Sequence, residues 1–279
     1  MKKTLTLVAL ITFAFTSSYS QDIYVNERLE KQWEVTGLKT PESVLYDPSG
    51  KVIYVANINE NPWEKDGNGY ISRHKVNGDI IDNEWVKELS APKGMGLLQN
   101  KLYVTNIDEV VEIDVTTAKI TKRYKHPEAV NLNDIAVGAD GRVFVSDSKG
   151  NYLFEILNGA MDILYQSEMP TNGLFYETGR LLCGQKNHLA ALDLTTKTMS
   201  IFIEETGSID GIEGVGDSTY VISDWSGRVH LIQQGQPKLL LLDTTPKEIN
   251  AADIEFDPNN RILFVPTFFK NSVAAYKLK

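Results

Sequence analysis

The chain contains little cysteine, little histidine and, after its first residues, no long apolar run. Its single cysteine, Cys183, excludes an intramolecular disulfide, and the apolar setting Leu181-Leu182-Cys183-Gly184 predicts a buried, unreactive thiol. The four histidines have neither the spacing of zinc ligands nor that of a catalytic triad. Because no segment has a sustained helical period either, the sequence predicts a domain that is nearly all β.

Basic residues are also in short supply, with 28 lysines and arginines against 37 aspartates and glutamates. The resulting net charge of −9 repels nucleic acid and anionic lipid, so neither is an expected partner. An acidic protein of this kind is instead well suited to binding a cation.

The one apolar run, Leu5 to Phe15, follows Lys2 and Lys3 and precedes Ser18-Tyr19-Ser20. A basic start, a short apolar stretch and small residues at the cut are typical of a cleaved secretory signal of bacterial type. The run is shorter than the ~20 residues that a spanning helix needs. We therefore expect residues 1–20 to be a signal peptide and residues 21–279 to form one periplasmic or secreted domain, with no membrane span after cleavage.

One short pattern occurs six times: a variable residue, usually a small residue, and an aliphatic one, followed by a turn and an apolar strand. The copies begin at Glu42, Lys93, Asn133, Asn172, Asp210 and Ala252, and their starts are 51, 40, 39, 38 and 42 residues apart. A period near 40 residues with four short strands per unit is typical of propeller blades. The sequence predicts a six-bladed β-propeller with four antiparallel strands per blade.

The two ends of the chain are complementary in this scheme. The last repeat has only three strands, and Gln32-Trp33-Glu34-Val35 precedes the first repeat without a blade of its own. We expect this N-terminal strand to complete the last blade and close the ring. The long first spacing reflects an insertion over residues 59–70, which is expected either to overhang the channel mouth or to form a solvated hairpin tip.

Equivalent residues of a propeller face one another around the central channel. This ring, which we call the channel ring, consists of Glu42, Lys93, Asn133, Asn172, Asp210 and Ala252. Oxygen donors without histidine or cysteine favour a hard divalent cation, with Ca²⁺ first and Mg²⁺ or Mn²⁺ as alternatives. The cation would also relieve repulsion between the two carboxylates. Strand alternation predicts that Asp134 and Glu213 point either away from the ring side chains or deeper into the blade.

These motifs resemble the gluconolactonase and regucalcin (senescence marker protein) family over about Glu42 to Lys279. The matching residues are Glu42, Asn172-Gly173-Leu174, Asp210-Gly211-Ile212, and Asn133-Asp134 ahead of Asp140-Gly141-Arg142. The resemblance implies that Glu42, Asn172 and Asp210 bind one metal ion. It further implies that Asn133 faces the substrate, that Asp210 also acts as general base, and that the metal polarises a lactone carbonyl.

Lys93 departs from the family pattern, since its ammonium could bind an anionic group of the substrate or weaken metal binding. Two functions therefore stay open. The first is an exported metal-dependent hydrolase of the lactonase type, acting on a small lactone or sugar derivative. The second is a non-catalytic propeller that binds a small ligand or a protein in the same channel. An ion pair from Lys93 to Glu42 or Asp210 would favour the second.

Overall fold

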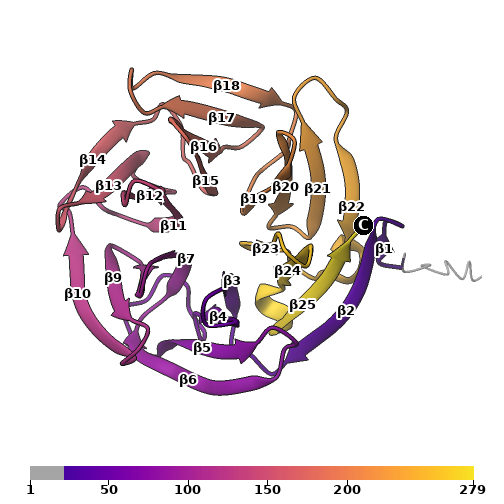
Figure 1. The fold of residues 1–279 in the computed structure, drawn as a ribbon, viewed down its shortest axis with the longest axis horizontal. Coiled ribbons are helices and arrows are strands. Elements are labelled where there is room, and N and C mark those ends of the chain that lie inside the picture. Colours follow the sequence, from indigo (N-terminus) through magenta and orange to yellow (C-terminus); the bar gives the residue numbers. More distant parts are fainter. Residues whose placement is uncertain (1–21) are drawn as a thin grey trace, which may run out of the picture.

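The computed structural model describes residues 22–279, and its strands form six antiparallel blades arranged in a ring (Figure 1). The expected signal peptide lies outside the described residues. Blade 1 contains β3 (Pro41–Asp47), β4 (Val52–Asn57), β5 (Gly69–Lys75) and β6 (Ile80–Leu89). Blade 2 contains β7 (Pro92–Leu98), β8 (Lys101–Asn106), β9 (Glu109–Asp114) and β10 (Lys119–Lys125). Blade 3 contains β11 (Leu132–Val137), β12 (Val143–Asp147), β13 (Tyr152–Leu157) and β14 (Ala160–Gln166).

The second half of the ring repeats this order. Blade 4 contains β15 (Leu174–Glu177), β16 (Arg180–Gly184), β17 (His188–Asp193) and β18 (Met199–Glu204). Blade 5 contains β19 (Ile212–Gly216), β20 (Thr219–Asp224), β21 (Arg228–Gln233) and β22 (Leu239–Asp243). Blade 6 contains β23 (Glu255–Asp257), β24 (Ile262–Pro266) and β25 (Ser272–Leu278). The structure thus confirms the six-bladed propeller.

The N-terminal strand closes the ring as expected. Strand β2 (Leu29–Thr36) pairs antiparallel with β25, from Leu29 opposite Leu278 to Thr36 opposite Ser272. A second N-terminal strand was not expected: β1 (Tyr24–Val25) pairs with the outer strand β22 and gives blade 5 a fifth strand. The chain start therefore ties two neighbouring blades together.

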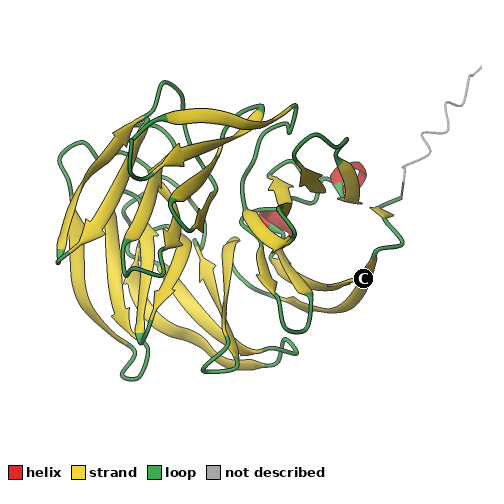
Figure 2. Ribbon diagram, turned by 45° about the horizontal axis from the view of Figure 1, so that its top comes forward, coloured by secondary structure: helices red, strands yellow, loops and turns green. Residues whose placement is uncertain are grey.

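Between residues 22 and 279, helical structure is confined to two single turns, η1 (Thr245–Lys247) and η2 (Phe268–Lys270) (Figure 2). Within the described part of the chain, neither has the length or the apolar character that crossing a membrane requires.

Apolar side chains fill the wedges between neighbouring blades. Phe264, which is fully buried, lies between Trp33 of the closing strand and Tyr46 of blade 1, with ring centroids 5.8 and 6.4 Å away. Cys183 is also fully buried, as predicted from the sequence, and burial raises the pKa of its thiol.

Side chains at the ends of second strands hold the segments that lead into the inner strands. Asn106 accepts hydrogen bonds from the backbone N–H groups of Ser90 and Ala91, at 2.8 and 3.1 Å. Asp147 accepts equivalent bonds from the segment that enters β11. Because these segments precede the channel ring, the contacts fix where each ring residue begins.

We expect Phe264→Ala to lower the free energy of unfolding by about 3–5 kcal/mol, because it leaves a cavity where the last blade meets the first. Phe269→Ala is the matched control, since Phe269 is 60% exposed. Urea unfolding of residues 21–279 measures both. Equal losses for the two variants would contradict a closure that depends on this aromatic wedge.

Candidate functional site

The channel ring lies where the inner strands begin, at the end of the channel that we call the mouth. The inner strands β3, β7, β11, β15, β19 and β23 surround the centre in Figure 1. Ladder pairing is irregular between Pro41 and Ser43 in β3, and between Leu132 and Ile135 in β11. Bulges of this kind re-aim side chains and are common beside functional sites.

Neighbouring inner strands touch one residue after the ring positions. A Cβ at Gly173 would lie 2.1 Å from the Asp210 carbonyl oxygen, and one at Gly94 would lie 2.5 Å from the Asp134 Cα. Hydroxyl groups of second strands add bridges between blades: Thr105 donates to the Asn133 carbonyl at 2.7 Å, and Ser223 donates to that of Ala252 at 2.7 Å. The backbone around the mouth is therefore closely packed.

Three oxygen atoms of the channel ring are buried without a hydrogen-bond donor among the described residues. They are Glu42 Oε2, Asn172 Oδ1 and Asp210 Oδ2, one from each residue that the family resemblance implies as a metal ligand. The amide of Asn172 donates to the other Asp210 oxygen, Oδ1, at 2.7 Å, so its own carbonyl oxygen stays free. Leaving such atoms unpaired costs about 1–3 kcal/mol each. Their chemistry fits a hard divalent cation, which would ligate all three.

The pKa values of the two carboxyl groups in the channel ring also favour a bound cation. Burial raises the pKa of Glu42 well above its usual range, and the nearby Asp210 adds to the rise while Lys93 opposes it. Burial likewise raises the pKa of Asp210 to about 7, with a contribution from Asp224 and against the hydrogen bond from Asn172. A bound cation would favour the ionised form of both groups.

The other three residues of the channel ring make contacts of different kinds. Asn133 donates from its amide to Ser148 Oγ at 3.4 Å, and Ala252 contributes only backbone. Lys93 is 3% exposed and donates to the carbonyl oxygens of Pro62 and Ala91, at 3.1 and 3.3 Å. Among the described residues, no ion pair includes Lys93, and no group of three or more His, Cys, Asp or Glu side chains has metal-binding geometry. The candidate metal ligands are thus two carboxylates and one amide.

The insertion over residues 59–70 reaches the channel ring. Besides the bond from Lys93 to Pro62, the Lys93 ammonium lies 5.5 Å from the ring centroid of Trp63, and that of Lys149 lies 4.1 Å from it. The insertion therefore reaches from blade 1 to residues of blades 2 and 3, as expected for an overhang, although most of its residues are exposed to solvent.

A cavity of about 420 Å³ opens beside Asn172 and Asp210. Met169, Ile209 and Trp225 give it apolar walls. Small-molecule sites commonly combine apolar walls with a few converging polar groups, so this cavity offers room for a substrate next to the candidate metal ligands.

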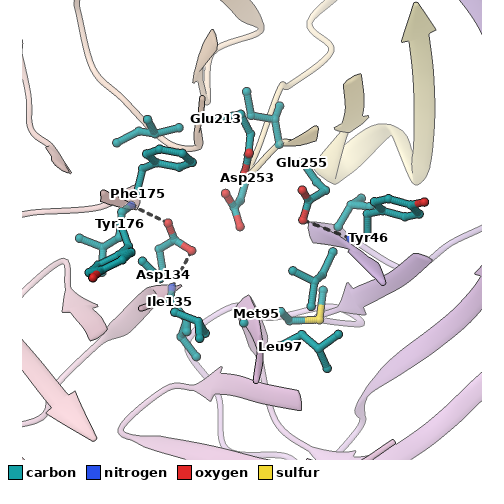
Figure 3. A pocket seen from close by; sticks show the side chains of 18 of the residues that line it. Tyr46, Met95, Leu97, Asp134, Ile135, Phe175, Tyr176, Glu213, Asp253 and Glu255 are labelled. Carbon is teal, nitrogen blue, oxygen red and sulfur yellow. Dashed lines mark hydrogen bonds between the residues drawn. The ribbon is translucent and has the colours of Figure 1, made fainter. Parts of the chain in front are cut away.

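A second cavity, of about 400 Å³, occupies the opposite end of the channel (Figure 3). Four carboxyl groups line it: those of Asp134, Glu213, Asp253 and Glu255. Burial raises the pKa of Asp134 to about 7 and that of Glu255 to about 8. Burial, with Glu255 and Asp134 nearby, also raises the pKa of Glu213 well above its usual range. These acids therefore retain protons at pH values where exposed carboxyls have lost them.

Strand alternation left two directions open for Asp134 and Glu213, and the structure places both away from the ring side chains, on the cavity at the opposite end of the channel. The irregular pairing of β11 includes Asp134, so alternation from Asn133 does not by itself fix the direction of its side chain. Asp210 precedes β19, which begins at Ile212, so it does not share a strand period with Glu213. Asp253 and Glu255 were not singled out from the sequence, although the alternation of acids after Ala252 was a visible signal.

Comparisons with known proteins support the fold. No family model matches the chain, and no curated protein matches it in sequence. Among solved structures, a catalytically inactive virginiamycin B lyase from Staphylococcus aureus with quinupristin has a TM-score of 0.63 at 14% identity, over 92% of this chain and 100% of that one. A protein provisionally assigned as a gluconolactonase has a TM-score of 0.62 at 15% identity, over 89% and 91% of the two chains. At these identities the likeness establishes a shared propeller fold.

We expect Glu213→Gln to stabilise the metal-free protein at pH 8 and to change it less at pH 5. A raised pKa means that the folded state holds the proton more firmly than the unfolded state. The stabilisation is present at low pH and is lost as pH rises through the folded pKa, by up to ~1.4 kcal/mol per pH unit for one proton. Glutamine cannot ionise, so the variant does not lose this stability as pH rises. The substitution also breaks no hydrogen bond, because none among the described residues involves the Glu213 carboxyl.

Urea unfolding in EDTA at pH 5, 6.5 and 8 measures this difference. Glu204→Gln, on the exposed surface of β18, is the matched control and is expected to follow the wild type. A Glu213→Gln profile parallel to that of the wild type would contradict a buried, proton-holding acid.

Proposed function

We propose that the mature chain is an exported, divalent-metal-dependent hydrolase of the lactonase type. The observation that carries the proposal is the set of unpaired, buried oxygens on Glu42, Asn172 and Asp210. These residues would hold the cation, with Ca²⁺ as the first expectation. Bound there, it would polarise a lactone or ester carbonyl and stabilise negative charge on its oxygen.

The side chains around this centre have distinct roles in the proposal. Asp210 accepts a proton from the attacking water, and the amide of Asn172 orients it through Oδ1. Asn133 orients the substrate from blade 3. The walls formed by Met169, Ile209 and Trp225 exclude bulk water from the cavity.

Lys93 bears on the choice between a hydrolase and a non-catalytic propeller. An ion pair from Lys93 into the channel ring would have supported the binding-only function. Lys93 instead donates to Pro62 and Ala91, which leaves the oxygens of Glu42 and Asp210 available. This arrangement supports the metal-dependent hydrolase, and the fold shared with a lyase and a provisional gluconolactonase is compatible with it.

We expect Ca²⁺ to raise the melting temperature of residues 21–279 relative to EDTA, because an ion that binds only the folded state stabilises it by about 2.7 kcal/mol at 100 times its Kd. Asp210→Ala should abolish the shift. Asp162→Ala, which removes an exposed carboxylate from β14, should retain it. The proposal fails if neither Ca²⁺, Mg²⁺ nor Mn²⁺ shifts the wild type.

We expect Asp210→Asn to lower kcat for lactone opening by about 10²–10⁴-fold, the range of a lost general base. A panel of γ- and δ-lactones with pH-stat detection measures this, with Asp162→Asn as control. Reaction in ¹⁸O-labelled water should place one label in the product acid. Product without label would indicate elimination in place of hydrolysis.

A further inference from the structure

Lysine side chains gather on one side of the mouth. Lys93 starts the inner strand of blade 2, Lys149 lies in the β12–β13 turn of blade 3, and Lys186 lies in the β16–β17 turn of blade 4. The mouth carboxylates Glu42 and Asp210 come from blades 1 and 5, and Asp224 ends β20 of blade 5. Positive charge is therefore concentrated beside the candidate metal ligands on blades 2 to 4.

Lys93 is unusual among these residues because it is buried. An ammonium group has three N–H donors, and the structure occupies two of them with the carbonyls of Pro62 and Ala91. One donor remains without an acceptor among the described residues. Burial lowers the pKa of Lys93 and Lys149 lowers it further, whereas Glu42 opposes the change. An anion placed between the two lysines would relieve their repulsion.

The indole ring of Trp63 contacts the ammonium groups of both Lys93 and Lys149. Its indole lies over both ammonium groups, 5.5 Å from that of Lys93 and 4.1 Å from that of Lys149, and its side chain is 55% exposed. The loop that carries it is anchored to blade 2 by an ion pair between Lys65 and Asp108 at 2.5 Å. The exposed indole is thus held at the mouth by contacts on both sides.

We propose that Lys93 and Lys149, beneath the indole of Trp63, bind a carboxylate group of the substrate, so that the enzyme acts on lactones or esters that carry a second, anionic group. The inference rests on the proposed function for the reaction, but the carboxylate site stands on its own geometry. Two ammonium groups beside the same aromatic ring supply one donor for each of the two oxygens of a carboxylate. A doubly charged phosphate commonly has more donors than this pair offers, such as an arginine fork or a helix N-terminus.

The test uses a matched pair of probes without a scissile bond, cyclopentanone and 3-oxocyclopentane-1-carboxylate. Isothermal titration calorimetry measures both against residues 21–279, in EDTA and in Ca²⁺. We expect the wild type to bind the carboxylate about tenfold more tightly than the ketone under both conditions, as one charge-assisted contact provides. Lys93→Met and Lys149→Met should each reduce that preference at least about threefold.

Lys119→Met is the control, because Lys119 is exposed on the outer strand β10 and should leave the preference unchanged. Lys149 is exposed, so Lys149→Met keeps the test valid even where the buried Lys93→Met fails to fold. No detectable binding of the carboxylate probe overturns the inference, as does a preference that survives in Lys149→Met. A preference that is present only with Ca²⁺ also overturns it, because the carboxylate would then be bound by the metal.

The same samples separate this inference from the proposed function. Loss of the Ca²⁺-dependent melting shift with an intact carboxylate preference would end the metal-hydrolase proposal and retain the carboxylate site. A normal melting shift and lactone opening, without carboxylate preference, would end the carboxylate-site inference and retain the metal-hydrolase proposal.

Discussion

The contact between neighbouring inner strands is the constraint on which the mouth depends. At Gly173 the backbone of the next blade comes so close that a Cβ would lie 2.1 Å from a carbonyl oxygen. A larger residue would separate the blades, since backbone cannot yield as the end of a side chain does. The small second residue of the repeat is therefore a packing requirement. Its consequence is a narrow channel, where one side chain from each blade meets the others.

Because the channel is narrow, its buried carboxyl groups lie close together. Their charge is compensated differently at the two ends of the channel. At the mouth, Glu42 and Asp210 each keep an oxygen without a donor, so an ion is the partner that would compensate their burial. At the opposite end, Asp134 accepts N–H groups from Leu174 and Ile135, both at 2.6 Å, and Asp253 accepts the Ser43 hydroxyl at 2.6 Å. There, hydrogen bonds and retained protons take the place of a cation.

The repeat made the blade number, the closing strand and the channel ring predictable, because each follows from spacing along the chain. Alternation could not decide between the two directions left open for Asp134 and Glu213, since a bulge and a strand start interrupt it. Strand β1 was missed because two residues carry no period. The contacts of Trp63 could not be predicted from the sequence for another reason. They join three blades, and no local sequence pattern indicates which turns a long loop will contact.

Lys93 connects these features. A lysine in a ring that we propose to bind a cation looks contradictory when only the charges of the ring residues are compared. The structure removes the contradiction by aiming the ammonium outward, where the insertion supplies the Pro62 carbonyl and the Trp63 indole. Without the insertion, the buried ammonium would lack those partners, and Glu42 would be its nearest source of compensation. The insertion in blade 1 and Lys93 of blade 2 therefore act together: their contacts leave the oxygens of Glu42 and Asp210 without an ion pair to Lys93 and keep a positive charge near them.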